Sequence, residues 1–171
     1  MTMSHPALLA FFLPLTRRTC AELGIGDEIV ARHLAEVLTE FARTDRLYRF
    51  RAPDGRTLAS VVEMLGMGPD DRYVGDFALF MSGLFRPFVE RGGYLGYYLD
   101  EGARAYARTT ARPTLARGER ALYGELARRF EYYAGALDYL RKARFPGLSD
   151  ADPVRAFARE IDGVLRGLSR N

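Results

Sequence analysis

Apolar side chains recur at intervals of three and four residues along most of this chain, a spacing that places them on one face of an α-helix. In residues 27–44, one such stripe contains Val30, Leu34, Val37, Leu38 and Phe41. Charged side chains occupy the opposite side of the same segment, which is typical of a helix at the protein surface. The repetition of this pattern predicts an all-α fold.

The same periodicity predicts helices over residues 73–85, 89–110 and 118–142. Residues 73–85 are apolar around most of the helical circumference, so we expect this helix to be buried on several sides and to pack against the following one. We expect residues 118–142 to form the longest helix. A last helix should begin after Asp152, because Asp152 can accept from free backbone N–H groups and Pro153 suits the first helical position.

The length of 171 residues suits one domain, a single-domain bundle of about six or seven helices over residues 1–171. We expect residues 1–26 to pack loosely as an N-terminal segment. Pro53-Asp54-Gly55 is a plausible turn, and a small hairpin near residues 47–58 is one prediction for the chain around it. The alternative is a short helix that Thr57 caps.

The chain contains one cysteine, Cys20, which excludes an intrachain disulfide and fits a reducing compartment. The apolar run at residues 7–15 is short, contains Pro14 and precedes its arginines, which is the wrong order for a signal peptide. No run reaches the ~18 apolar residues that cross a bilayer. We therefore expect a cytoplasmic protein with no membrane span.

The charges are nearly balanced overall but are unevenly distributed. The formal net charge is +3, which argues against nucleic acid as a partner. Residues 57–103 contain seven acidic and three basic side chains, whereas residues 104–144 contain four acidic and ten basic ones. Such blocks can pair within the fold or between subunits, so a protein partner or self-association is expected.

The most distinctive passage is Gly75-Asp76-Phe77-x-Leu79-Phe80-x-x-Gly83-x-Phe85, followed by Tyr97-Tyr98-x-x-x-Gly102-x-x-x-Tyr106. It resembles the pattern of an uncharacterised family of bacterial all-helical proteins. The resemblance covers roughly residues 34–140. It implies an all-helical fold and brings no activity or cofactor with it.

Asp76 lies at the edge of an otherwise apolar helix, so its carboxylate needs hydrogen-bond or ionic partners if it is buried. Tyrosine hydroxyl groups or an arginine would serve. The favoured interpretation is that Asp76 ties its helix to a neighbour. The alternative is a carboxylate that orients a ligand or acts in catalysis.

Tyr98, Gly102 and Tyr106 are four residues apart, so two rings flank a position without a side chain on one helical face. We call this gap the Gly102 notch. The favoured occupant is another helix, and the alternative is a small ligand with the tyrosine hydroxyl groups as polar contacts. The candidate ligand-binding residues are therefore Asp76, Tyr98, Gly102 and Tyr106.

Known catalytic and cofactor motifs are missing from the sequence. Phosphate-binding loops, dinucleotide fingerprints and nucleophile elbows do not occur, and no Glu-x-x-His pair is present for a di-iron site. His33, at the edge of an apolar stripe, is expected to be a packed or half-exposed residue rather than a haem or metal ligand. We expect no catalytic residues, no metal and no cofactor.

These observations favour a non-enzymatic cytoplasmic helical protein that acts through protein–protein contacts, as a homodimer or as a component of a bacterial assembly. The alternative is a small-molecule-binding protein or an enzyme, with a pocket around Asp76, Tyr98, Gly102 and Tyr106.

Overall fold

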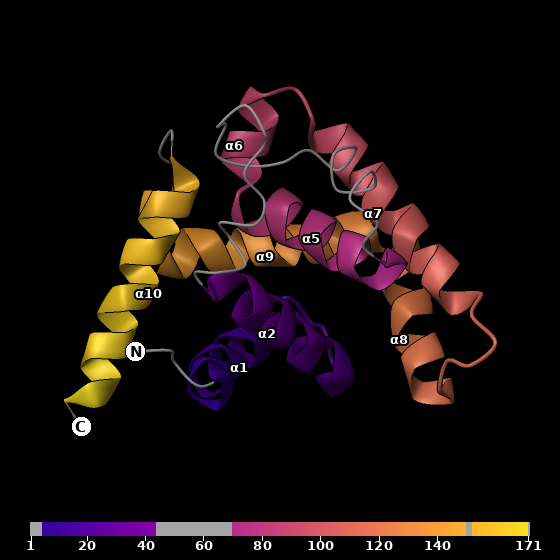
Figure 1. Cartoon of the computed structure of the whole chain (residues 1–171), viewed down its shortest axis with the longest axis horizontal. Coiled ribbons are helices and arrows are strands. Elements are labelled where there is room, and N and C mark those ends of the chain that lie inside the picture. The colour runs from indigo at the N-terminus through magenta and orange to yellow at the C-terminus, as the bar shows by residue number, and fades with distance from the viewer. Residues whose placement is uncertain (1–4, 44–69, 150–151, 171) are drawn as a thin grey trace.

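The computed structural model describes residues 5–43, 70–149 and 152–170, and in these ranges the chain is all-α and forms a single domain. The elements are α1 (His5–Glu22), α2 (Glu28–Ala42), α5 (Asp71–Leu84), α6 (Arg86–Arg91), α7 (Leu95–Thr110), α8 (Arg117–Arg128), α9 (Phe130–Arg144), the 3-10 turn η1 (Pro146–Ser149) and α10 (Pro153–Ser169). Helices α5 and α9 cross the middle of the molecule. The α1–α2 pair lies on one side of them and α6 and α7 on the other (Figure 1).

The centre of the core is α5, which packs against α2, α7 and α9. Ten of its residues are buried, from Val74 to Leu84, because apolar side chains surround most of the helix. Its first turn is capped by the Asp70 carboxylate, which accepts from the backbone N–H of Tyr73 at 2.9 Å. The expected helix over residues 73–85, buried on several sides and packed against the following helix, is confirmed.

Two other expected helices are also present, with their caps in place. Asp27 accepts from the N–H groups of Ile29 and Val30 at the start of α2. Asp152 accepts from the N–H of Arg155, and Pro153 occupies the first turn of α10. Helix α2 buries the apolar stripe that the sequence shows, and α10 buries the first half of its stripe.

The helix expected over residues 89–110 is wrong as a continuous element, because the chain is interrupted between α6 and α7. Gly93 has φ +77°, a left-handed conformation that ends the short helix α6. The chain then starts α7 at Leu95, so the turn allows α7 to lie along α5.

The helix expected over residues 118–142 is likewise two helices, which meet at Arg129. Arg129 has φ −123° and ψ 35°, outside the helical range. The two halves have different partners, since α8 packs mainly on α7 and α9 mainly on α5. One straight helix could not pack on both partners. The expectation that residues 118–142 form the longest helix is also wrong, because α1, with 18 residues, is the longest of the described helices.

The N-terminal segment is packed more closely than expected. Helix α1 lies against α2 and also contacts α9. It buries Leu8, Phe12 and Cys20, of which Phe12 is completely inaccessible. The expectation of a loosely packed segment over residues 1–26 is therefore wrong for α1, because its apolar side chains supply part of the core. The alternatives for residues 47–58 lie outside the described residues.

None of the helices formed by the described residues is both long enough and apolar enough to cross a membrane.

Candidate functional site

Three helices meet at a buried polar cluster made by His33 of α2, Asp76 of α5 and Tyr106 of α7, which we call the polar node. The Tyr106 hydroxyl donates to Asp76 Oδ1 at 2.6 Å. His33 Nε2 lies 3.2 Å from the same carboxylate oxygen and 3.3 Å from the Tyr106 hydroxyl. A proton on Nε2 can therefore be shared between both oxygens.

The polar node is shielded from water to different degrees. Tyr106 is completely buried, and the side chains of His33 and Asp76 are 7% and 19% exposed. Burial raises the pKa of Tyr106 well above its usual value, and the adjacent Asp76 charge and hydrogen bond raise it further. Tyr123 of α8 closes the cluster, with its ring centroid 5.6 Å from that of His33. Burial and the Asp76 charge also raise the pKa of Tyr123.

The chemistry of the polar node suits a link between helices. The Asp76 carboxylate has two partners within 3.2 Å, one from each neighbouring helix. Burying a charged group is costly unless such partners accompany it. The adjacent Gly75 makes the arrangement fit, because a Cβ there would lie 2.5 Å from Tyr106 ring atoms. Gly75 and Asp76 together thus seat the ring and the hydroxyl of one tyrosine.

The Gly102 notch is filled from α9 and α5. A Cβ on Gly102 would overlap the ring of Phe130 and lie 2.8 Å from Ala78 Cβ. Gly83 plays the same part on α5, where a Cβ would lie 2.5 Å from Leu137 Cβ. The sequence left two occupants open for the notch, another helix or a small ligand, and the notch holds the Phe130 ring of helix α9.

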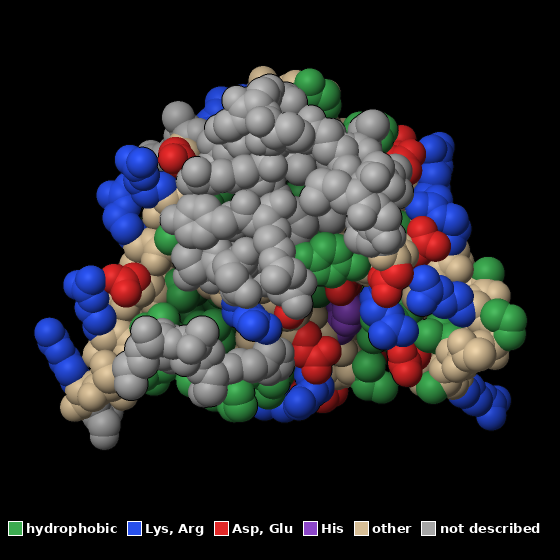
Figure 2. Space-filling view, viewed as in Figure 1, with side chains coloured by type: hydrophobic (Ala, Val, Ile, Leu, Met, Phe, Trp, Pro, Cys, Tyr) green, Lys and Arg blue, Asp and Glu red, His purple; other side chains and the backbone are tan. Residues whose placement is uncertain are grey.

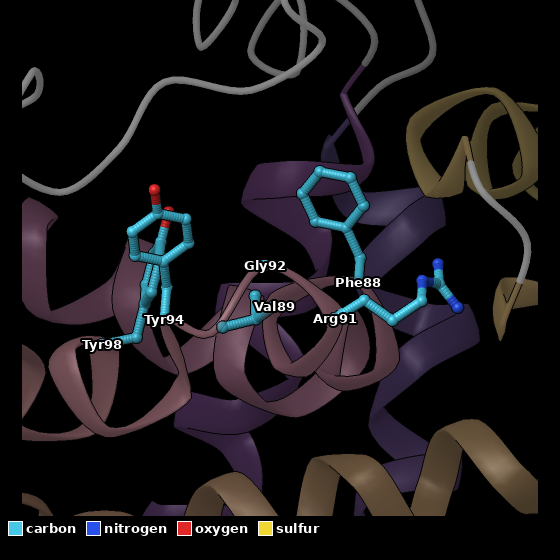
Figure 3. Close-up of a pocket in the computed structure, with 6 residues that line it drawn as sticks. All are labelled: Phe88, Val89, Arg91, Gly92, Tyr94 and Tyr98. Carbon is cyan, nitrogen blue, oxygen red and sulfur yellow. The ribbon is translucent and has the colours of Figure 1, made fainter.

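Tyr98 lies at a different place, where it lines a hollow of about 280 Å³ with Tyr94 and three residues of α6. In Figure 3 the two tyrosine rings overlap and point the same way, across from Phe88, with Val89 and Gly92 between them. The Arg91 side chain extends away from the tyrosines in this view. The hollow is mostly apolar, and we call it the Tyr98 hollow.

The four sequence-predicted ligand residues therefore do not converge on one pocket. Asp76 and Tyr106 meet in the polar node, Gly102 receives Phe130, and Tyr98 lines the Tyr98 hollow. The residue that sequence reasoning did not join to Asp76 is His33, which lies 43 positions earlier in the chain. The only signal for it was a histidine at the edge of an apolar stripe, which does not name a partner.

A second feature is the uneven burial of α10. Val154, Phe157 and Ile161 are at most 4% exposed, whereas Leu168, on the same helical stripe, is 46% exposed. The helix stands at one end of the molecule (Figure 1), where its described contacts are mainly with α2 and η1. Its last turns therefore present apolar side chains that the described part of the chain does not cover fully.

Charged residues pair across helices within the fold. Arg108 of the basic block donates to Asp71 of the acidic block at 2.9 Å, and Arg72 of α5 donates to Glu119 of α8 at 3.1 Å, so ion pairs join α5 to both α7 and α8. Figure 2 shows acidic and basic side chains interspersed over this part of the surface. At least part of the charge segregation therefore serves contacts inside one chain.

Within residues 5–43, 70–149 and 152–170, no group of three or more His, Cys, Asp or Glu side chains is placed to hold a metal ion. No protein-family model, curated protein or solved structure matches the chain. The resemblance to a bacterial helical family thus stays a prediction.

Proposed function

We propose that this protein acts in the cytoplasm by binding other proteins, either a second copy of itself or another component of a bacterial assembly, and that it catalyses no reaction. The observation that carries the proposal is the apolar stripe of α10. The core covers its first half, and Leu168 near its end remains 46% exposed. Contiguous exposed apolar surface of this kind is typical of sites that another protein covers.

The neighbouring residues extend this surface. Val164 and Leu165 are only half-buried on the same side of α10. Exposed arginines occupy the other side of the helix; they are Arg155, Arg159, Arg166 and Arg170. An apolar strip of this kind fits a partner that presents an apolar centre of its own.

Two further observations support the proposal. The Asp76 carboxylate and the Gly102 notch have neighbouring side chains as partners, which argues against the catalytic or ligand-orienting use of Asp76 and the ligand-binding use of the notch. The single cysteine, Cys20, is buried and unpaired, as suits a reducing compartment.

The test measures assembly by native mass spectrometry and light scattering from 1 to 100 µM, together with capture of partners from an extract of the source bacterium. We expect the protein to dimerise or to retain one partner in fixed ratio. Leu168→Glu should abolish this contact without changing the thermal unfolding temperature, because the side chain is already exposed.

Ile29→Glu is the matched control, because Ile29 is 60% exposed but lies at the start of α2, away from the α10 stripe. A wild type that stays monomeric and retains no partner would refute the proposal. So would a contact that Ile29→Glu breaks and Leu168→Glu leaves intact.

The second candidate is a small-molecule-binding protein that uses the Tyr98 hollow. Its support is the hollow itself, with three aromatic rings around an apolar floor. Native mass spectrometry would then show added mass that disappears on denaturation. Tyr94→Ala should remove that mass and leave the fold intact, since Tyr94 is 56% exposed.

A further inference from the structure

A polar cleft of about 360 Å³ lies between the α1–α2 loop and the junction of α8 with α9. Its size is near the lower end of the range for ligand pockets, ~300–1,000 Å³. The loop contributes Gly24, Gly26 and Asp27, and the junction contributes Glu125, Arg128 and Arg129 together with two tyrosines. The cleft shares no residue with the polar node, the Tyr98 hollow or the α10 stripe.

The basic wall of the cleft is held in place. The Arg129 guanidinium lies 4.3 Å from the centroid of the Tyr132 ring, a cation–π distance. The Tyr132 hydroxyl in turn donates to the Leu23 carbonyl at 3.0 Å, which ties the ring to the loop on the other side. Arg128 donates to Glu125 at 2.7 Å. Each guanidinium has five N–H donors, so one bond to Glu125 leaves donors for a ligand.

The acidic side of the cleft consists of the Glu125 and Asp27 carboxylates, and each accepts hydrogen bonds from neighbouring groups. Glu125 accepts from Tyr133 at 2.7 Å as well as from Arg128, and these bonds hold the pKa of Glu125 below its usual value. Asp27 uses one carboxylate oxygen, Oδ1, for its capping bonds to the start of α2. Its Oδ2 carries lone pairs that can accept from an ammonium group.

The cleft therefore presents two arginines, both paired with Glu125, and two carboxylates, with no net formal charge. A simple anion would gain from the arginines but would be repelled by Asp27 and Glu125. A simple cation has the reverse problem. A molecule with both charges avoids each penalty, and fixed groups reduce the entropy lost when it binds.

We propose that this cleft binds a small zwitterion of amino-acid type, with its carboxylate at Arg128 and Arg129 and its ammonium group at Asp27. The loop favours close approach, because a Cβ at Gly24 or Gly26 would meet no atom within 4 Å. At these two positions the wall of the cleft is backbone, beside the Asp27 side chain.

The test screens the twenty common amino acids at 10 mM for a rise in the melting temperature of the full chain. Sodium acetate, methylammonium chloride and inorganic phosphate serve as single-charge probes at equal ionic strength. We expect at least one amino acid to raise the melting temperature, by roughly 5–10 °C when its concentration is about 100 times Kd. The single-charge probes should produce a smaller rise.

Calorimetric titration of variants then locates the site. Arg129→Gln and Asp27→Ser should each weaken binding at least tenfold, and serine at position 27 retains a capping oxygen for α2. Arg32→Gln is the matched control, because Arg32 is about as exposed as Arg129 and makes an i,i+4 surface pair with Glu36, as Arg129 does with Glu125. Its affinity should equal that of the wild type.

Three outcomes would overturn the proposal. The first is that no amino acid shifts the melting temperature. The second is that phosphate or acetate binds as tightly as any amino acid, which would mean that Asp27 takes no part. The third is that Arg129→Gln and Asp27→Ser, shown to be folded by circular dichroism, bind as the wild type does.

Discussion

Tyr106→Phe removes one hydroxyl group from the polar node and leaves the aromatic ring against Gly75. The Asp76 carboxylate then loses a 2.6 Å hydrogen bond, and His33 loses a partner at 3.3 Å. Hydrogen bonds to charged groups contribute about 1.5–3 kcal/mol. Because the Asp76 side chain is 19% exposed, water can replace part of the lost bond. We therefore expect the free energy of unfolding at pH 7 to fall by about 1–3 kcal/mol.

The same variant should change the alkaline pH dependence of stability. The folded-state pKa of Tyr106 is raised, so between the unfolded pKa of ~10 and the folded value the native state binds more protons than the unfolded state. Stability conferred by this group is complete below pH ~10 and is lost as the pH rises toward the folded pKa. The slope from one such group reaches about 1.4 kcal/mol per pH unit, and Tyr106→Phe should remove it.

The assay is urea unfolding at pH 7 and at intervals from pH 9.5 to 11.5. Tyr139→Phe is the control, because the Tyr139 hydroxyl also donates to a carboxylate, Glu22 Oε2, at 2.7 Å, but at the exposed surface. Its loss of stability should be much smaller. Equal losses in the two variants, or an alkaline slope that Tyr106→Phe leaves unchanged, would refute the argument that burial makes the polar node strong.

Three further predictions concern the packing at Gly102, the burial of Cys20 and the cap of α10. Gly102→Ala should lower the unfolding free energy, measured by urea titration, by about 1–3 kcal/mol, because its Cβ would overlap Phe130. Gly135→Ala should raise it by about 0.5–1 kcal/mol, because a Cβ there meets no atom within 4 Å. A gain at both positions would contradict the close packing at Gly102. Burial raises the pKa of Cys20 to about 11 from 9.0, which lowers the fraction of reactive thiolate. At pH 8 a thiol reagent should therefore react roughly 100-fold more slowly with folded than with unfolded protein. Equal rates would show that the thiol is accessible. Asp152→Ala removes the cap of α10 and should lower the unfolding free energy by about 1 kcal/mol, which calorimetry can measure; no change would mean that water replaces the cap.

The sequence predicts those helices whose signals are local. The stripe and the Asp27 cap of α2 lie within one segment, as do Asp152, Pro153 and the stripe of α10. The breaks at Gly93 and Arg129 are different. Apolar periodicity continues across both, and the chain bends because the segments on either side have different partners. These packing partners lie far away in the sequence, and the spacing of apolar residues within one segment does not reveal them.

The same limit applies to the candidate site. The position of Asp76 on an apolar helix predicts that it needs a partner, and a tyrosine hydroxyl is what it receives. The sequence could not specify that Tyr106 would provide it, nor that His33 would join from α2. It also placed Tyr98 with Tyr106 on one helical face, but the eight residues between them along α7 are enough for the two side chains to meet different neighbours.

The distinctive motif of the chain is explained in large part by contacts among α5, α7 and α9. Gly75 admits the Tyr106 ring, Gly83 admits Leu137, and Gly102 admits Phe130. Substitutions at these glycines or at the side chains packed on them would disturb the core. The motif therefore describes how three helices fit together rather than which molecule the protein binds. Binding must then depend on residues that the core does not require. The exposed end of α10 and the charged cleft beside Arg129 meet that condition, which is why the experiments above are directed at these two surfaces.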